Sequence, residues 1–353
     1  MFTSDNWAGA HPAVSESLSR HASGFAAAYG TSDLDRAVEE RIAALFEREV
    51  AVMFVATGTA ANALAMAAVN RPGGVVFAHR EAHVIEDECG AVEHLTGGAR
   101  LRPVDGALGR LDARELERQI AAFGVHGVHS GQPMAVTVTQ GTEVGTHYTV
   151  DEVREIAHVA HGHGIPLHMD GARFANALVA SGASPADMTW RAGVDVLSFG
   201  ATKNGCWCAE ALVFFDATMA EPVAYLRKRA AQLLSKTRFV AAQFDAHLHD
   251  ELWLRCAEHA NAAAERLRAR LVEGGAELAW ETTTNEVFAW LTPAQSAALD
   301  AAGLSHGDWG VPHGVDAQDG RSLKRFVTSF ATRDEDVDHV GVALSSVAGR
   351  QAA

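Results

Sequence analysis

Three charged side chains follow two apolar segments of the sequence. Asp170 and Arg173 come directly after the largely apolar residues 165–169, and Lys203 follows the apolar residues 194–199. Pyridoxal phosphate chemistry requires a lysine that holds the aldehyde as an imine, an acid that keeps the pyridine nitrogen protonated, and an arginine that grips a carboxylate with two hydrogen bonds. The pattern therefore predicts Lys203 as the imine former, Asp170 as the ring partner and Arg173 as the clamp.

Each of these residues also has an ordinary structural alternative. An aspartate at the end of a strand often caps a turn or a helix, whereas single arginines and lysines usually lie in solvent. The placement of all three at the ends of successive predicted strands favours a shared site.

The segment Thr57-Gly-Thr-Ala-Ala-Asn62 predicts a phosphate site. It joins an apolar strand to a helix, and the first turn of a helix offers unpaired backbone N–H groups and the positive end of the helix dipole. Threonine hydroxyls add further donors. The alternative is that the threonines only cap the helix. Beside a cofactor lysine, we expect Gly58 and Thr59 to contact the phosphate.

His83 and Glu88 follow another predicted strand, at residues 75–78. An imidazole at this point can stack on the cofactor ring and relay protons, because its pKa lies near physiological pH. Glu88 can orient that base or position a water molecule. The alternatives are a histidine that only makes structural hydrogen bonds and an acid on a helix surface.

Strands and helices alternate through the first two thirds of the chain, which indicates an α/β fold. The predicted strands are residues 50–55, 75–78, 135–139, 166–169, 194–199 and 211–215, and the predicted helices include 33–46, 57–69 and 150–161. Continuous apolar strands separated by helices indicate a mostly parallel sheet covered on both faces. Because ligands bind beyond the carboxyl ends of such strands, Asp170, Lys203 and residues 57–59 should lie on one side.

The character of the sequence changes after about residue 217. Long charged helices are predicted at residues 219–235 and 251–273. A smaller unit follows, with strands at 286–291 and 323–330 and helices at 293–302 and 335–347. We therefore predict a large domain at residues 1–247, which includes the N-terminal segment, and a small C-terminal α+β domain at residues 248–353.

Composition favours an enzyme that acts on a small molecule. The 353 residues are 48% hydrophobic and carry a formal net charge of −15, so neither nucleic acid nor an anionic membrane is an expected partner. No apolar stretch approaches the roughly 20 residues that span a bilayer, and the N-terminus lacks the pattern of a signal peptide. We expect a cytoplasmic protein.

The cysteines and one group of histidines raise the question of a metal site. Four cysteines are too few for a disulfide scaffold, and the pair Cys206 and Cys208 has no second cysteine or histidine pair at zinc spacing. Packing is favoured over ligation for both. His158 and His161 fall within a predicted helix while His163 points elsewhere, which favours a solvated helix end. We therefore predict no metal site.

Taken together, these motifs resemble the threonine aldolases of the β-eliminating lyase group, within the fold-type-I pyridoxal-phosphate enzymes. The resemblance spans nearly the whole chain. It rests on Ser4-Asp5-Asn6, Tyr29-Gly30, residues 57–62, Glu81-Ala-His83 with Glu88, residues 168–173, residues 198–203 and Lys324-Arg-Phe-Val-Thr328. It implies a seven-stranded, mostly parallel sheet in the large domain and cleavage of β-hydroxy-α-amino acids, such as L-threonine, L-allo-threonine or phenylserine, to glycine and an aldehyde.

The resemblance also implies roles for single residues. His83 stacks on the pyridine ring, and Thr202 lies beside the cofactor next to Lys203. Ser4, Arg173 and Arg325 hold the carboxylate of the substrate. Tyr29 approaches the site of a neighbouring subunit, because such enzymes are homodimers or homotetramers.

The chain departs from the family pattern at residues 139–147. Many relatives have Glu-Asn-Thr-His-Asn near this strand end, with the histidine proposed to engage the substrate hydroxyl, whereas this chain has Thr142 and Glu143. Glu143 is therefore a candidate substrate contact, and the chain resembles the low-specificity or phenylserine-type aldolases. The base that removes the hydroxyl proton is left open between His83 and a water held by Glu88.

Two other functions remain compatible with the sequence. One is another pyridoxal-phosphate reaction, such as β-elimination or transamination, because the lysine, aspartate and arginine are common to these reactions. The other is a catalytically silent α/β binding or assembly protein.

Overall fold

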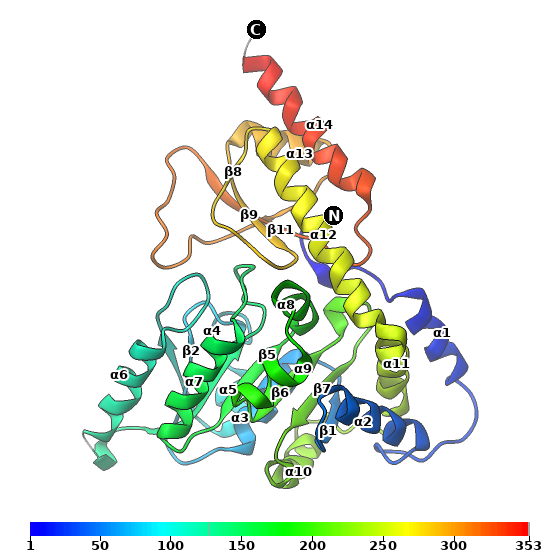
Figure 1. The fold of residues 1–353 in the computed structure, drawn as a ribbon, viewed down its shortest axis with the longest axis vertical. Helices are drawn as coiled ribbons and strands as arrows, with labels where there is room; N and C mark the ends of the chain where they lie inside the picture. The colour runs from blue at the N-terminus through cyan, green and yellow to red at the C-terminus, as the bar shows by residue number, and fades with distance from the viewer. Residues whose placement is uncertain (126, 352–353) are drawn as a thin grey trace.

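The computed structural model describes residues 1–125 and 127–351, which form a large sheet domain and a smaller domain beside it (Figure 1). The large sheet contains β1 (Ala51–Val55), β2 (Gly74–His79), β3 (Arg100–Val104), β4 (Gln132–Thr139), β5 (Leu167–Gly171), β6 (Val196–Gly200) and β7 (Glu210–Phe214). Their order is β1-β7-β6-β5-β4-β2-β3, and only β7 runs against its neighbours. The predicted seven-stranded, mostly parallel sheet is confirmed.

Both faces of this sheet are covered, as the apolar strands predicted. Along β2, Val75 and Phe77 pack into one core cluster, whereas Val76 and Ala78 pack into a second cluster. This split follows the two-residue period of a strand. One face carries α2 (Asp33–Leu45), α6 (Ala113–Gly124), α7 (Val150–Gly162) and α11 (Arg238–Leu248), and the other carries α3 (Gly58–Ala68), α5 (Ala91–Thr96) and α10 (Glu221–Arg229).

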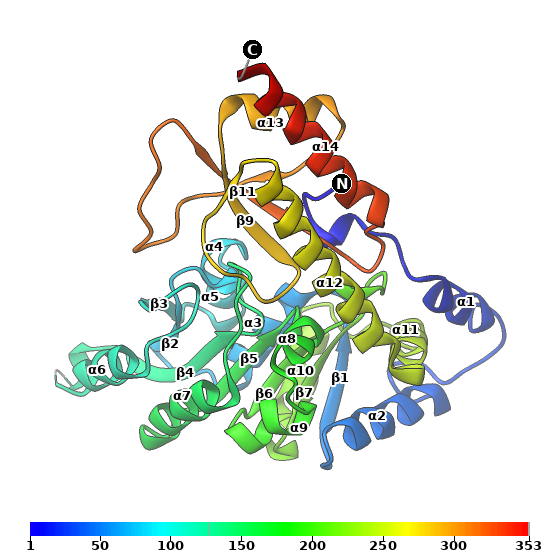
Figure 2. The ribbon, with the colours of Figure 1, turned by 45° about the horizontal axis from the view of Figure 1, so that its top comes forward.

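The small domain contains a four-stranded antiparallel sheet in the order β10-β11-β9-β8. Its strands are β8 (Glu277–Leu278), β9 (Glu286–Leu291), β10 (Gly307–Asp308) and β11 (Ser322–Val327), and its helices are α12 (Leu252–Glu273), α13 (Pro293–Ala301) and α14 (Asp334–Gln351). Figure 2 shows α12 running from the large domain to this sheet. The division at residues 247 and 248 remains a prediction.

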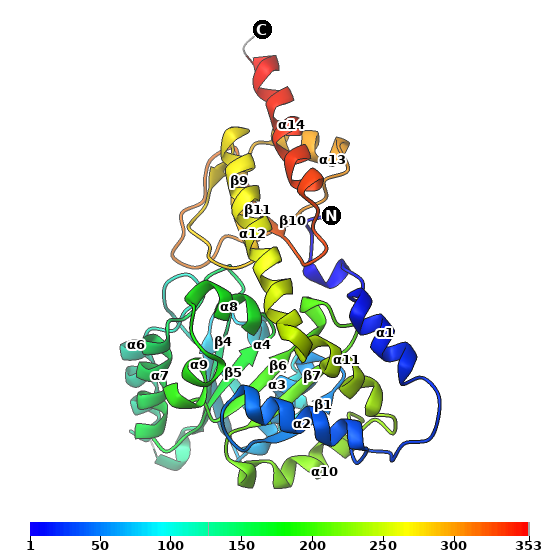
Figure 3. The ribbon, with the colours of Figure 1, turned by 45° about the vertical axis from the view of Figure 1, so that its right-hand side comes forward.

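The N-terminal segment joins the two domains. Phe2 is buried in the small-domain core, and its carbonyl accepts a hydrogen bond from the Val327 amide at 2.8 Å. The chain then continues through α1 (Pro12–Arg20) beside α11, as Figure 3 shows. The residues between, including Ser4 and Asp5, are therefore held near the large sheet.

Several elements differ from the sequence-based prediction. The helix predicted at residues 219–235 is wrong in length, because α10 ends at Arg229 and Ala231 has a left-handed φ of 58°. The turn brings the Gln232 side chain to the Ala56 amide, with a hydrogen bond of 3.1 Å, so tertiary contacts override the helical pattern. The sequence pattern also predicted no strand at β3, an edge strand with exposed Arg100 and Arg102, and none at the two-residue strands β8 and β10.

Candidate active site

One cavity of about 410 Å³ brings most of the predicted site residues together. Its lining includes Thr57, Gly58, Thr59, Asn62, His83, Glu88, Asp170, Thr202, Lys203 and Glu210. These residues come from the ends of β1, β2, β5 and β6 and from the start of β7. β1, β2, β5 and β6 run in one direction, so their carboxyl ends meet on one side of the sheet.

Asp170 is held at the end of β5 by two donors. Its Oδ1 accepts from the Ala172 amide at 3.0 Å, and its Oδ2 accepts from Asn62 Nδ2 at 2.9 Å. The same Asn62 nitrogen also donates to Glu88 Oε1 at 2.7 Å, and Glu88 Oε1 lies 2.9 Å from His83 Nδ1. One asparagine thus links the predicted ring partner to the predicted histidine through a carboxylate.

The contact between His83 and Glu88 and their burial shift the pKa of both residues. The hydrogen bond that His83 donates to the Glu88 carboxylate raises the pKa of His83, although burial acts in the opposite direction. Burial raises the pKa of Glu88, and its bond to His83 opposes that rise. With Nδ1 occupied by Glu88, the ring can use Nε2 to exchange a proton with a ligand in the cavity.

The start of α3 offers the predicted phosphate site. Thr57 is the N-cap, and its hydroxyl accepts from the Ala60 amide at 3.2 Å. The amides of Gly58 and Thr59, in the first turn, have no intrahelical acceptor. A Cβ atom at Gly58 would meet no atom within 4 Å, so the cavity is open there. The start of α3 therefore combines unpaired donors, a helix dipole and room for an anion.

Lys203 lies in a short 3-10 turn (Thr202–Asn204) that follows β6. The turn is fixed on both sides of the lysine: the Thr202 hydroxyl accepts from the Ala209 amide at 3.1 Å, and the Asn204 side chain donates to the Trp253 carbonyl at 2.7 Å. Glu210, the first residue of β7, is buried beside this turn, and burial raises its pKa to about 7.

The two predicted clamp arginines lie in a buried cluster of charges. Arg173 Nε is 2.8 Å from Asp5 Oδ2, and its Nη2 is 3.2 Å from Asp5 Oδ1. The other end of the guanidinium is less tightly paired, with Nη1 3.7 Å from Glu143 Oε1 and Nη2 3.4 Å from Glu286 Oε1. Arg325 Nη1 lies 3.6 Å from the same Glu286 oxygen.

This cluster leaves polar atoms without partners. Within residues 1–125 and 127–351, Arg173 Nη1, Arg325 Nε, Glu143 Oε1 and both Glu286 carboxylate oxygens are buried and make no hydrogen bond. Buried donors normally find an acceptor. The two free N–H groups are therefore suited to a carboxylate brought in by a ligand.

Ser4 and Tyr29, which were also predicted to contact the substrate, do not line the cavity. Ser4 directly precedes Asp5, and its hydroxyl accepts from the Asn6 amide at 3.1 Å. Tyr29 is 51% exposed and does not line the cavity of its own subunit. The structure therefore gathers the predicted lysine, aspartate, histidine and phosphate contacts in one cavity, joins the arginines in a neighbouring cluster, and leaves Tyr29 on the surface.

Comparison with known proteins decides the family. The model of the family described as β-eliminating lyase matches residues 2–294. The chain belongs to this family. It is 41% identical to a low specificity L-threonine aldolase of Pseudomonas aeruginosa over 86% of this chain and 87% of that protein. A second low specificity L-threonine aldolase, from a Pseudomonas strain, is 38% identical over 85% of this chain and 86% of that protein.

A solved structure agrees with the assignment of this β-eliminating lyase. The threonine aldolase of Leishmania major superposes with a TM-score of 0.91 at 28% identity, covering 98% of each chain. The predicted resemblance, the fold-type-I architecture, the lyase class and pyridoxal phosphate as cofactor are confirmed.

The residues in the cavity fit this cofactor. Its volume of about 410 Å³ lies within the range of roughly 300–1,000 Å³ that small-molecule sites occupy. The start of a helix at Gly58, a carboxylate at Asp170 and an amine at Lys203 line the same space. They match the phosphate, the ring nitrogen and the aldehyde of pyridoxal phosphate.

Several polar residues of the site were not assigned roles from the sequence. Asn62 and Asp5 were included only as members of motifs, and Glu210 and Glu286 were not considered. The sequence did contain a signal for Glu210 and Glu286, since each is a charged residue at the start of an otherwise apolar strand. Charged groups in buried strands are uncommon unless they are paired or functional.

The histidines and cysteines considered as possible metal ligands do not form a cluster. In the part of the chain that the structure describes, no group of three or more His, Cys, Asp or Glu is arranged to hold a metal ion. His161 pairs with Asp195 at 2.8 Å and His163 with Glu117 at 3.0 Å, at the end of α7. Cys206 is buried and Cys208 half-buried.

No helix among the described residues is long and apolar enough to span a membrane.

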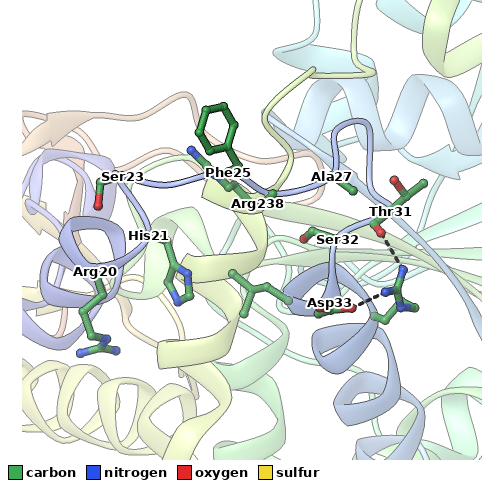
Figure 4. A pocket seen from close by; sticks show the side chains of 12 residues that line it. Arg20, His21, Ser23, Phe25, Ala27, Thr31, Ser32, Asp33 and Arg238 are labelled. Atoms are coloured by element: carbon green, nitrogen blue, oxygen red, sulfur yellow. Dashed lines mark hydrogen bonds and ion pairs between the residues drawn. The ribbon is translucent and has the colours of Figure 1, made fainter.

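A second cavity, of about 260 Å³, lies away from the site between the end of α1 and the start of α2 (Figure 4). It is lined by the exposed loop that carries Phe25, with Arg20, His21 and Arg238 around it. Phe25 is fully exposed. This loop precedes Tyr29, so the two exposed aromatic residues belong to one surface segment.

Proposed function

We propose that this chain cleaves β-hydroxy-α-amino acids between Cα and Cβ, releasing glycine and an aldehyde. The observation that carries the proposal is the joint lining of one cavity by Lys203, Asp170 and His83 in a chain 41% identical to a low specificity L-threonine aldolase. We propose L-threonine, L-allo-threonine and phenylserine as the substrate class.

The cofactor supplies an aldehyde for a lysine and a ring that accepts the electrons of the broken bond. Lys203 is the proposed lysine, and Asp170 the proposed partner of the ring nitrogen. Asn62 and the Ala172 amide hold the Asp170 carboxylate in one orientation, which supports this role. Gly58 and Thr59 are the proposed phosphate contacts, with Thr202 bracing the turn that carries the lysine.

The carboxylate of the substrate is proposed to bind at Arg173 and Arg325. Asp5 fixes one edge of the Arg173 guanidinium through two hydrogen bonds, while Nη1 remains available. Ser4, next to Asp5, is proposed as a third contact. Glu143 lies within 3.7 Å of Arg173, which supports its proposed place at the border of the substrate pocket.

His83 is the proposed acceptor of the hydroxyl proton. Its Nδ1 bonds to Glu88, so Nε2 is the atom that can take the proton from the β-hydroxyl. The raised pKa of His83 makes the imidazole a stronger base than an isolated histidine. Glu88 is the proposed group that orients this histidine.

We further propose a cytoplasmic homodimer or homotetramer with sites shared between subunits. Phe25 and Tyr29, on one surface segment, are exposed in the single chain, and Trp207 lines the cavity while 66% exposed. Large exposed aromatics of this kind mark association surfaces. The measured mass of the protein in solution tests this part of the proposal.

The product assay tests the reaction. Purified holoenzyme is supplied with L-threonine, L-allo-threonine, L-phenylserine and the D-isomers in separate reactions. We expect glycine and one equivalent of the matching aldehyde from at least one L-isomer. A 2-oxo acid with ammonia would instead establish elimination, and dependence on an added oxo acid would establish transamination.

A further inference from the structure

Glu286 occupies an unusual position between the two clamp arginines. It is the first residue of β9 and is fully buried. Its Oε1 lies 3.4 Å from Arg173 Nη2 and 3.6 Å from Arg325 Nη1. Both distances exceed those of a good charge-assisted hydrogen bond. Neither oxygen has a hydrogen-bond partner among the described residues.

The charges of this cluster do not balance. The carboxyl groups of Asp5, Glu143 and Glu286 face the guanidinium groups of Arg173 and Arg325. Three ionised acids against these two arginines leave one negative charge beside Lys203, whose own charge acts on Asp5 and Glu143 but is not among the charges that act on Glu286. A substrate carboxylate would add a second one, and like charges at this spacing in a buried site strongly oppose each other.

We propose that Glu286 takes up one proton from solvent when the carboxylate of an amino acid binds at Arg173 and Arg325. The proton bonds to a carboxylate oxygen of Glu286, and no bond of the substrate changes in this step. Glu286 is thus a positioning residue that frees both arginines for the ligand. This inference rests on the proposed function, because it takes the two arginines as the carboxylate site.

The surroundings single out Glu286 among the three acids. Asp5 receives two hydrogen bonds from Arg173 and one from Asn285 at 3.1 Å, so it is committed as a carboxylate. Only one oxygen of Glu143 is buried without a partner, against both of Glu286, and the positive charge of Arg173 lowers the pKa of Glu143 despite its burial. Burial dominates at Glu286 and raises its pKa to about 7, against the pull of Arg173 and Arg325.

Because Glu286 has the raised pKa among the three acids, its protonation determines how the affinity for a carboxylate depends on pH. Below neutral pH, Glu286 already carries the proton, so a carboxylate binds without uptake. At pH 8 and above, Glu286 is ionised in the free enzyme and must be protonated as the carboxylate enters. The apparent Kd for a carboxylate ligand should therefore rise by up to tenfold for each pH unit above 7.

Calorimetry on the holoenzyme tests the proposal. Glycine is titrated at pH 8.5 in buffers of different ionisation enthalpy, which gives the number of protons taken up. 2-Aminoethanol is the matched ligand, because its amine is similar and it lacks the carboxylate. We expect wild type to take up more protons with glycine than with 2-aminoethanol, by up to one, and we expect Glu286→Gln to abolish this difference.

The control variant is Glu281→Gln, the same change at an exposed carboxyl group shortly before β9. It should behave as wild type. Equal proton uptake with glycine and 2-aminoethanol in wild type, which needs no variant, would overturn the proposal, as would an unchanged difference in Glu286→Gln. If the proposed function itself were wrong, glycine would fail to bind or no glycine would be formed from substrate, which is a separate result.

Discussion

Replacement of Asn62 by leucine should reveal how strongly the site depends on one amide. Leucine has nearly the same shape but donates no hydrogen bond, so Glu88 and Asp170 would each lose a buried donor. Both carboxyl groups are at most 5% exposed, so solvent that enters the cavity replaces that donor only poorly. A hydrogen bond to a charged group contributes about 1.5–3 kcal/mol.

The free-energy costs of losing these two hydrogen bonds do not add fully. Glu88 can become neutral by taking up a proton, because burial already raises its pKa, whereas Asp170 keeps only the Ala172 amide. We therefore expect Asn62→Leu to lower the free energy of unfolding by about 3 kcal/mol. The affinity for pyridoxal phosphate should fall as well, since Asp170 is less firmly oriented.

Urea unfolding of the cofactor-free protein at pH 8 measures the first effect, and titration with pyridoxal phosphate measures the second. The control is Asn70→Leu, just beyond α3, because Asn70 Nδ2 donates to a neutral carbonyl, that of Thr96, at 2.7 Å. A neutral hydrogen bond contributes about 1 kcal/mol. The reasoning is refuted if Asn62→Leu costs no more stability than Asn70→Leu and leaves cofactor affinity unchanged.

Three further predictions concern single residues of the site. Lys203→Ala should lose the visible absorbance of the bound cofactor and at least about a thousandfold in turnover; normal turnover would disprove its role. Arg173→Lys should raise KM by about 10–100-fold while the cofactor spectrum persists, because lysine cannot form the planar fork; loss of the spectrum with unchanged KM would argue against a carboxylate clamp. Glu210→Gln should stabilise the cofactor-free protein above pH 7 by about 3 kcal/mol, since burial raises the pKa of Glu210 from 4.5 to about 7 and ionisation then costs stability. Unfolding curves at pH 8.5 and pH 4 check this, with equal stability expected at pH 4.

The sequence predicted the residues that follow strands better than those that meet through tertiary packing. Asp170, Lys203 and the turn at Thr57 could be grouped because parallel strands end on the same side of a sheet. His83 joined them for the same reason. The architecture followed from apolar runs separated by helices, and eight of the eleven strands among the described residues lie close to a predicted range.

Contacts between distant segments were outside the reach of pattern reasoning. Asp5 and Glu286 reach Arg173 from the N-terminal segment and from the small domain, and no local signal specifies that convergence. The link from Asn62 to both carboxylates depends on how α3 packs against β5. β3 was missed because an exposed edge strand lacks the apolar run that marks its buried neighbours.

The bond that is broken can be read directly from the products of one reaction in heavy water. We expect L-threonine and the holoenzyme to yield acetaldehyde and an equal amount of glycine that carries deuterium at Cα, where the Cβ atom was attached. Deuterated threonine that keeps its side chain would show racemisation instead. A 2-oxo acid and ammonia in place of glycine would contradict the account, because they would show that the cavity around Lys203 serves elimination and not aldol cleavage.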